Sequence, residues 1–420
     1  MVAIDLVIRR ARLRGREGLW DVGLAGGRIA AVAPTTDERG REEIDAAGGL
    51  VTPTFVNPHV HLDKTMLGDV MRPNVSQTLQ EAIQITWDFK RAYTDDDIVG
   101  RAGPVVEAAV AYGTTILRAF ADVDSITGLR AVRGLLALRE RYGGVAEIQV
   151  VAFPQEGIIR DPGTDRLLRE AMALGADVVG GLPWYERTDE QMRRHIDVVF
   201  EIAQAADADI HMLVDDTDDP NARSLEYLAV KTLEAGYRGR VTASHCGALA
   251  AYNDTYAAKV IGMVAEAGIT ICSNPHISLV LAGRRDREPV RRGITRVREL
   301  LAAGVNVASG QDDVNDPYYP FGRNSQAEVA LFMAHTAHLT YPDEIERCFD
   351  MVTTNAARAL RRDGYGCAPG DRADLNVWRA PSVREVLRLQ QPPAYVLKDG
   401  RILTAWTWRV EHRWGAAGAV

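Results

Sequence analysis

The sequence predicts an α/β fold in which a (β/α)8 TIM barrel carries a small β domain built from both ends of the chain. Two observations predict it. In the middle of the chain, eight strand-like runs alternate with helical stretches, which favours a parallel barrel over an open doubly wound sheet. Both ends of the chain read instead as short strands and turns. We therefore expect a barrel over 54–357 and a β domain made from 1–53 and 358–420.

The terminal segments carry turn signals between their strands. Gly26-Gly27 and Asp399-Gly400 are dipeptides typical of hairpin turns. The barrel strands alternate with helices, several of which end at a glycine, the usual residue after a helix C-terminus. The eight expected barrel strands lie at 52–61, 114–123, 147–155, 176–183, 208–216, 241–246, 269–275 and 305–313.

Composition excludes several classes of function. The chain has 49 lysines and arginines against 57 acidic residues, a formal net charge of −8. Binding to nucleic acid or to an anionic membrane needs clustered positive charge, so we expect neither partner. Four separated cysteines without a CxxC pair suit a reducing cytoplasm. Because no GxGxxG or Walker loop opens a helix, nothing predicts a nucleotide phosphate site.

Polar side chains collect where the predicted barrel strands end. His59 and His61 are alternate residues at the end of one strand, so both imidazoles face the same way. His245 ends another strand, and Asp312-Asp313 end the last one. In a barrel these ends form the active-site face. Three histidines and a carboxylate there predict a site for zinc or iron.

Each of these motifs also has a purely structural interpretation. Alternation along any strand can produce His-x-His, and His245 alone suits a hydrogen-bonded core histidine. Asp312-Asp313 alone suits a helix N-cap or a solvated turn. Their coincidence at the strand ends of one barrel favours the functional interpretation.

Long motifs at these positions resemble the amidohydrolase superfamily, in its bacterial cytosine deaminase branch. They are NPHVHLDKT, AFPQEGI, TASHCGALAAYNDTY and GQDDVNDPYYPFG, with PGDRADLNV and LKDGRIL near the C-terminus. The resemblance spans nearly the whole chain. It implies that the terminal β domain is a β-sandwich and that the protein is a metal-dependent hydrolase. Because members of this family commonly assemble through barrel surfaces, a homo-oligomer is one expectation.

The resemblance also implies roles for individual residues. It makes His59, His61 and Asp312 ligands of one divalent metal ion, zinc or iron, and His245 the group that orients the attacking water. The resemblance makes Gln155 a substrate-binding residue and Asp216 the general acid/base. It makes Asp313, the second aspartate of strand 8, a group that contacts the substrate or moves protons. Tyr318 stands where the family usually has a tryptophan that covers the substrate.

The fifth predicted strand departs from the family pattern. The residue 32 positions before His245, where the family has its fourth metal ligand, is Leu213, and Asp216 stands in place of a catalytic glutamate. His211 shares the inward parity of Leu213 but lies about 6–7 Å deeper. Three alternatives stay open: His211 is a displaced ligand after a slip or bulge, His245 completes a site with water, or the metal is absent.

Two pocket positions have become aromatic. Phe120 and Trp184 stand where the family often has histidine, which predicts a substrate larger or more apolar than cytosine. Lys64 is expected to be a surface lysine or a salt-bridged one, with Asp63 as one candidate partner.

The leading hypothesis is therefore metal-dependent hydrolysis of a C–N bond in a nitrogen heterocycle or cyclic amide other than cytosine. The alternatives are a different, metal-poor reaction on a small cyclic substrate, or a relic that only binds a ligand.

Overall fold

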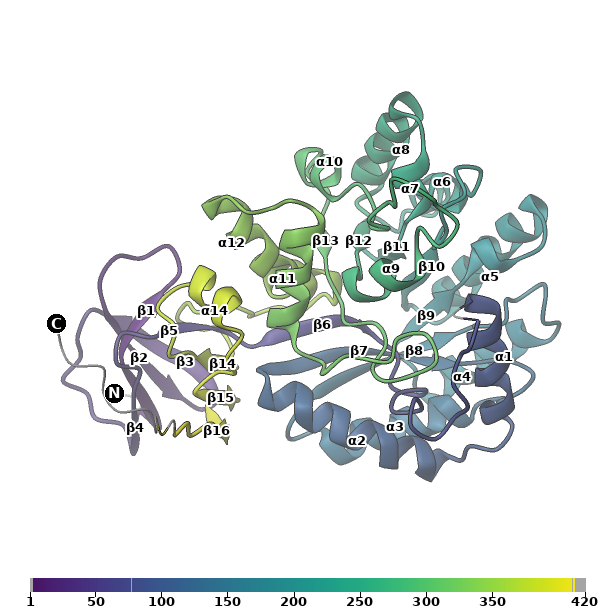
Figure 1. The fold of residues 1–420 in the computed structure, drawn as a ribbon. Coiled ribbons are helices and arrows are strands. Elements are labelled where there is room, and N and C mark those ends of the chain that lie inside the picture. The colour runs from purple at the N-terminus through teal and green to yellow at the C-terminus, as the bar shows by residue number, and fades with distance from the viewer. Residues whose placement is uncertain (1–2, 77, 410, 412–420) are drawn as a thin grey trace.

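The computed structural model describes residues 3–76, 78–409 and 411, and it confirms the predicted fold class (Figure 1). Eight parallel strands follow one another around the barrel in chain order. These strands are β6 (Phe55–Val60), β7 (Thr114–Asp122), β8 (Glu147–Phe153), β9 (Val178–Gly181), β10 (Asp209–Val214), β11 (Val241–His245), β12 (Thr270–Cys272) and β13 (Val307–Ala308). β7 is buried along its whole length, as expected of a strand that helices cover on one face and barrel side chains on the other.

Helices surround the barrel. Several begin at a threonine or asparagine whose side chain accepts a hydrogen bond from the first turn, such as Thr94, Thr188 and Asn253. The helices are α1 (Leu79–Lys90), α2 (Asp95–Ala111), α3 (Arg130–Tyr142), α4 (Thr164–Leu174), the 3₁₀ turn η1 (Pro183–Tyr185), α5 (Asp189–Ala205), α6 (Ser224–Glu234), α7 (Ala248–Ala251), α8 (Asp254–Ala267), α9 (Pro275–Leu281), α10 (Val297–Ala302), α11 (Gln326–Thr336), α12 (Pro342–Met351), α13 (Thr354–Ala359) and α14 (Val383–Leu389). Among the described residues, none of these helices combines the length and the apolar character that crossing a membrane requires.

The barrel closes between its first and last strands. Val60 of β6 forms a parallel bridge with Asp312, just beyond β13. The backbone N–H of His61 donates to the carbonyl of Asp312 at 2.9 Å, and the N–H of Asp312 donates to the carbonyl of His59 at 2.9 Å. The predicted metal ligands from opposite ends of the barrel segment are thus held together by the backbone itself.

The two ends of the chain share one sheet. Figure 1 shows the purple N-terminal strands and the yellow C-terminal strands together, beside the barrel. The strands are β1 (Leu6–Leu13), β2 (Trp20–Ala25), β3 (Arg28–Ala33), β4 (Glu42–Asp45), β5 (Leu50–Pro53), β14 (Leu375–Val377), β15 (Tyr395–Lys398) and β16 (Arg401–Ala405). β14 joins β5 antiparallel, which links the C-terminal strands to the N-terminal ones. Both predicted hairpin turns are present, at Gly26-Gly27 and Asp399-Gly400, with positive φ at all four residues.

One expected strand differs. The run 52–61 is divided at Thr54, where the chain leaves the terminal sheet and enters the barrel. The N–H of Thr54 donates to Asp374 beside β14, whereas the N–H of Phe55 donates to Gly113 beside β7. The division of the chain at 53/54 and 357/358 stays a prediction, and residues 1–2, 410 and 412–420 of the terminal segments lie outside the described residues.

Candidate active site

The predicted histidines and aspartate meet at the carboxyl end of the barrel. The Nε2 atoms of His59 and His61 lie 3.3 and 3.4 Å from Oδ1 of Asp312. Nε2 of His245 lies 3.5 Å from Oδ2 of the same carboxylate. All four residues are buried. The structure thus brings together the residues that the sequence analysis selected as metal ligands.

The backbone is strained where these side chains are displayed. His245 has φ +67° and Asp312 has φ +70°, in the left-handed region that non-glycine residues rarely occupy. Such strain costs about 1–3 kcal/mol per residue and concentrates at functional sites. Gly310 permits a close approach here, because a Cβ at this position would lie 2.8 Å from Cβ of His59. The last strand can therefore pack directly against the histidine pair.

The protonation states suit a cation. Burial lowers the pKa of His59 and lowers that of His61 well below the usual value, which keeps both imidazoles in the neutral form that binds metals. Burial alone raises the pKa of Asp312, but His59 and His245 hold it below its usual range. Both ring nitrogens of His245 are buried without a hydrogen-bond partner among the described residues. Neutral imidazoles, a carboxylate and unused nitrogen atoms fit a zinc or iron ion.

The fifth barrel strand places Leu213 and His211 as their parity predicted. β10 pairs with β11 without a register shift, and Leu213 lies opposite Ser244. Leu213 lines the cavity above the cluster and packs with Phe120 and Leu182. His211 is deeper and fully buried, and its Nε2 lies 2.7 Å from Oγ of Ser244.

A cavity of about 50 Å³ opens beside the cluster. Its lining includes five of the residues predicted to bind substrate or move protons: Gln155, Trp184, Asp216, Asp313 and Tyr318. Phe120, expected in the same wall, lies instead beneath the cluster, stacked on the ring of His59 at 4.1 Å between centroids. It supports a predicted ligand and does not line the cavity.

Two carboxyl groups in the cavity have raised pKa values. Burial raises the pKa of Asp216, whose Oδ1 lies 3.6 Å from Nδ1 of His245. Burial, together with repulsion from Asp316 and Asp312, raises the pKa of Asp313 well above its usual value. A carboxyl group whose pKa lies closer to neutrality exchanges protons more readily, which suits a general acid/base.

Lys64 is salt-bridged, which was one of its two expected states, but its partner is Asp122. Lys64 is not a surface residue but is 2% exposed, and it lines the cavity. Its Nζ donates to Oδ1 of Asp122 at 2.9 Å and to Oε1 of Gln155 at 2.8 Å. Gln155 thus turns its carbonyl to Lys64, so its NH2 group is the donor left for a ligand. The HLDKT motif alone carried no signal for this contact, because Asp122 belongs to a different strand.

A buried charge cluster lies next to Lys64 and was not anticipated. Lys90, the last residue of α1, is 1% exposed. Its Nζ lies 2.6 Å from Oδ2 of Asp122, 2.6 Å from Oδ2 of Asp124 and 3.2 Å from Oε1 of Glu156. This cluster ties α1 to the ends of β7 and β8.

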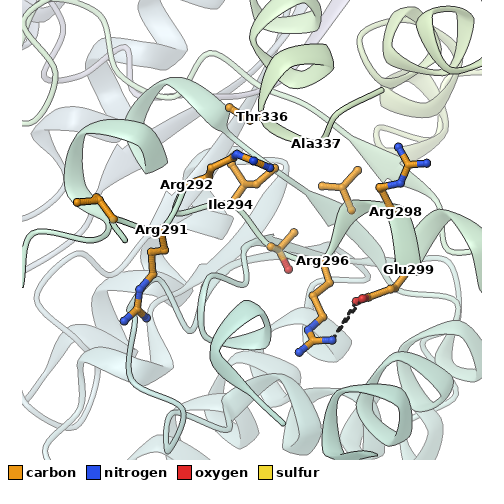
Figure 2. Close-up of a pocket in the computed structure, with 11 residues that line it drawn as sticks. Arg291, Arg292, Ile294, Arg296, Arg298, Glu299, Thr336 and Ala337 are labelled. Atoms are coloured by element: carbon orange, nitrogen blue, oxygen red, sulfur yellow. Dashed lines mark hydrogen bonds and ion pairs between the residues drawn. The ribbon is translucent and has the colours of Figure 1, made fainter. Parts of the chain in front are cut away.

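A second hollow, of about 430 Å³, lies beside α10 and the end of α11, and Figure 2 shows the side chains that line it. Four arginines line it, and three of them, Arg291, Arg296 and Arg298, pair with carboxylates. Nη1 of Arg296 lies 3.3 Å from Oε1 of Glu299, and Nε of Arg291 lies 2.7 Å from Oδ2 of Asp286. Among the described residues that line this hollow, none belongs to the predicted site. This hollow therefore lies apart from the predicted site at the barrel mouth.

Comparisons with known proteins return amidohydrolases and deaminases. A model of the amidohydrolase family matches residues 42–404. N-isopropylammelide isopropyl amidohydrolase of Pseudomonas sp. (strain ADP) is 30% identical over 404 residues, covering 95% of this chain and 97% of that protein. Pterin deaminase of Rhizobium rhizogenes is 30% identical over 397 residues, covering 92% of this chain and 89% of that protein. The crystal structure of 5-methylcytosine deaminase from Klebsiella pneumoniae with phosphonocytosine superposes with a TM-score of 0.92 at 35% identity, covering 97% of this chain and 100% of that one.

Proposed function

Because this chain belongs to the amidohydrolase family, in its cytosine deaminase-like branch, we propose that it hydrolyses a C–N bond of a nitrogen heterocycle or cyclic amide other than cytosine. The observation that carries the proposal is the convergence of three neutral or unpartnered imidazoles on one buried carboxylate, beside a cavity lined by acid/base groups. The substrate is a small molecule, and the reaction is a deamination or an amide hydrolysis.

The cluster would hold one divalent ion, zinc or iron. His59, His61 and Asp312 are the assigned ligands, and His245 is the fourth side chain within reach. When bound, such an ion makes water a nucleophile near neutral pH.

The remaining side chains bind the ring and move protons. Asp216 takes the proton from the attacking water and returns it to the leaving nitrogen, and His245 beside it orients that water. Asp313, whose raised pKa favours the protonated form, donates to an acceptor on the substrate. The NH2 group of Gln155, oriented by Lys64, donates to a ring carbonyl or ring nitrogen. A buried donor of this kind rejects ligands that lack the matching acceptor.

Apolar side chains favour a substituted ring over cytosine. Leu213, Trp184 and Leu182 form one wall of the cavity. Each buried methylene of a substituent contributes about 0.8 kcal/mol against such a wall. We expect kcat/KM for cytosine to be at least about tenfold below that for an alkyl-substituted ring with the same carbonyl, since two methylenes suffice for that difference. Steady-state kinetics over a series of alkylated pyrimidines and triazines checks this, and efficient turnover of cytosine would contradict it.

Metal analysis tests the reaction class. Purified protein is expected to carry about one zinc or iron ion per chain, since the cluster forms one site. Dialysis against a chelator should remove activity, and addition of either metal should restore it. Protein that stays free of metal after expression with added zinc and iron, yet still turns over substrate, would overturn the metal mechanism and favour a different reaction.

Restoring a histidine at the fifth strand should strengthen the site. Leu213→His places an imidazole beside the cluster, and we expect zinc to bind at least about tenfold more tightly, equivalent to about 1.4 kcal/mol. Competition with a chromophoric chelator measures this. Leu213→Met, which keeps an apolar side chain, serves as the matched control. If zinc binding is the same in all three proteins, Leu213 does not occupy the position of a ligand.

A further inference from the structure

Four buried polar side chains form a continuous row beneath the cluster, and three of them have no role in the function proposed above. Nη1 of Arg118, on β7, lies 3.4 Å from Nδ1 of His211. Nε2 of His211 lies 2.7 Å from Oγ of Ser244, and that same Oγ lies 2.7 Å from Nδ1 of His59. The row therefore runs from Arg118 through His211 and Ser244 to a predicted metal ligand.

The direction of each hydrogen bond follows from the chemistry of the groups. A guanidinium can only donate, so Nδ1 of His211 must accept. A charged imidazole so close to Arg118 would be repelled, so His211 is neutral and carries its one proton on Nε2. That N–H donates to Oγ of Ser244.

Ser244 then offers its second lone pair to His59. A hydroxyl oxygen accepts two hydrogen bonds and donates one. Ser244 lies opposite Cys272 across β11 and β12, and Sγ of Cys272, within 4.8 Å of ring nitrogens of His59 and His211, can accept the hydroxyl proton of Ser244. Oγ can therefore accept both from Nε2–H of His211 and from Nδ1–H of His59. In this tautomer Nε2 of His59 carries no proton, and its lone pair faces the Asp312 carboxylate.

We propose that His211 is a positioning residue for the metal site: with Arg118 it holds Ser244 so that Ser244 accepts from Nδ1 of His59 and leaves Nε2 free to bind the ion. The inference rests on the proposed function, because it concerns the same metal. It explains how a strand that lacks the family's ligand at Leu213 still supports the cluster, since the outer partner of a ligating histidine fixes its tautomer and its orientation.

Direct ligation by His211 is the competing interpretation, and the surroundings oppose it. His59, His211 and Cys272 lie close enough to hold an ion between them. However, Oγ of Ser244 already lies 2.7 Å from a nitrogen of each histidine and occupies the space between them. The permanent charge of Arg118 beside His211 would also repel a cation.

Zinc affinity, measured by competition with a chromophoric chelator, separates these interpretations. We expect His211→Leu to weaken zinc binding about 10–100-fold, the usual cost of removing an outer partner. In His211→Gln the side-chain amide keeps an acceptor for Arg118 and a donor for Ser244. Its zinc affinity should therefore stay within about threefold of that of the wild type. A ligand would fail this rescue, and equal losses in both variants would overturn the proposal.

Ser244→Ala provides an independent variant should His211→Leu not fold. It should lose about 10–100-fold in zinc affinity, and the double variant with His211→Leu should lose no more than the weaker-binding single variant, because both act through one chain of hydrogen bonds. His195→Gln, at a second fully buried barrel histidine that bonds Glu186 instead, controls for general damage and should leave zinc affinity unchanged.

Failure of the proposed function and failure of this inference alone give different experimental results. Wild-type protein that binds no zinc or iron overturns the proposed function together with this inference. Wild-type protein that binds zinc, with His211→Leu and Ser244→Ala unchanged in affinity, overturns the inference alone. Nitrogen NMR of the zinc-loaded wild type should show His59 protonated at Nδ1 and not at Nε2, and the opposite tautomer would also overturn it.

Discussion

Replacing Asp216 by asparagine is expected to lower kcat by a factor of about 10²–10⁴, the usual contribution of a general acid/base. The amide cannot accept the proton of the attacking water. Asp216 lies in the cavity with Oδ1 3.6 Å from Nδ1 of His245, and it is not among the assigned ligands. The metal content of Asp216→Asn should therefore equal that of the wild type. Steady-state kinetics and metal analysis on the same preparation measure both quantities.

Two further variants serve as controls for Asp216→Asn. Asp218→Asn changes a nearby carboxylate that pairs with Arg291 outside the cavity, and it should leave kcat within about twofold. Asp216→Glu lengthens the side chain by one methylene toward the family pattern and should keep part of the activity, because a carboxylate still reaches the proton. If Asp216→Asn retained wild-type kcat, the acid/base role would belong elsewhere, with Asp313 as the next group to replace.

Lys90→Met is expected to lower the free energy of unfolding by about 3–5 kcal/mol. Although burial alone lowers the pKa of Lys90, the carboxylates of Asp122, Asp124 and Glu156 raise it well above its usual value, so this lysine is charged. Methionine fills a similar volume but leaves Asp124 and Glu156 without this cation, and Asp122 with Lys64 alone. Breaking a buried ion pair on one side is costly because the other side stays charged and desolvated. Urea unfolding followed by circular dichroism measures the change.

An exposed lysine is the matched control. Lys259 pairs with Glu226 on the outer helices, and its side chain is 59% exposed. Lys259→Met should cost less than about 1 kcal/mol, since solvent screens such pairs. A Lys90→Met protein as stable as Lys259→Met would mean that the buried carboxyl groups take up protons when the cation is removed.

The alternation of strands and helices made the barrel predictable, because each strand carries its own apolar run and each helix its own periodicity. The sequence pattern predicted one strand over 52–61, although the expected domain boundary at 53/54 falls inside it, and the structure breaks the strand at Thr54. Residues on both sides of it have the same extended, buried pattern, and only the partners of Thr54 and Phe55 differ. Partner choice across the chain is a tertiary property that a local pattern does not contain.

The site shows the same contrast. His59, His61, His245 and Asp312 were predictable because a barrel brings all strand ends to one face. Lys64 was not, because a lysine beside an aspartate reads the same whether it is solvated or buried against another strand. Phe120 was assigned to the cavity wall because it stands where the family often has histidine, and the structure places its ring one layer lower, against His59.

The bridge between Val60 and Asp312 has a consequence for how this protein comes into being. The predicted metal ligands lie where the last barrel strand pairs with the first. The complete ligand set therefore cannot form until the last strand has been synthesised and has docked on the first. Contacts between such distant segments form late in folding. A chain stalled during translation would contain the histidine pair without its carboxylate, and the protein would become active only when the barrel has closed.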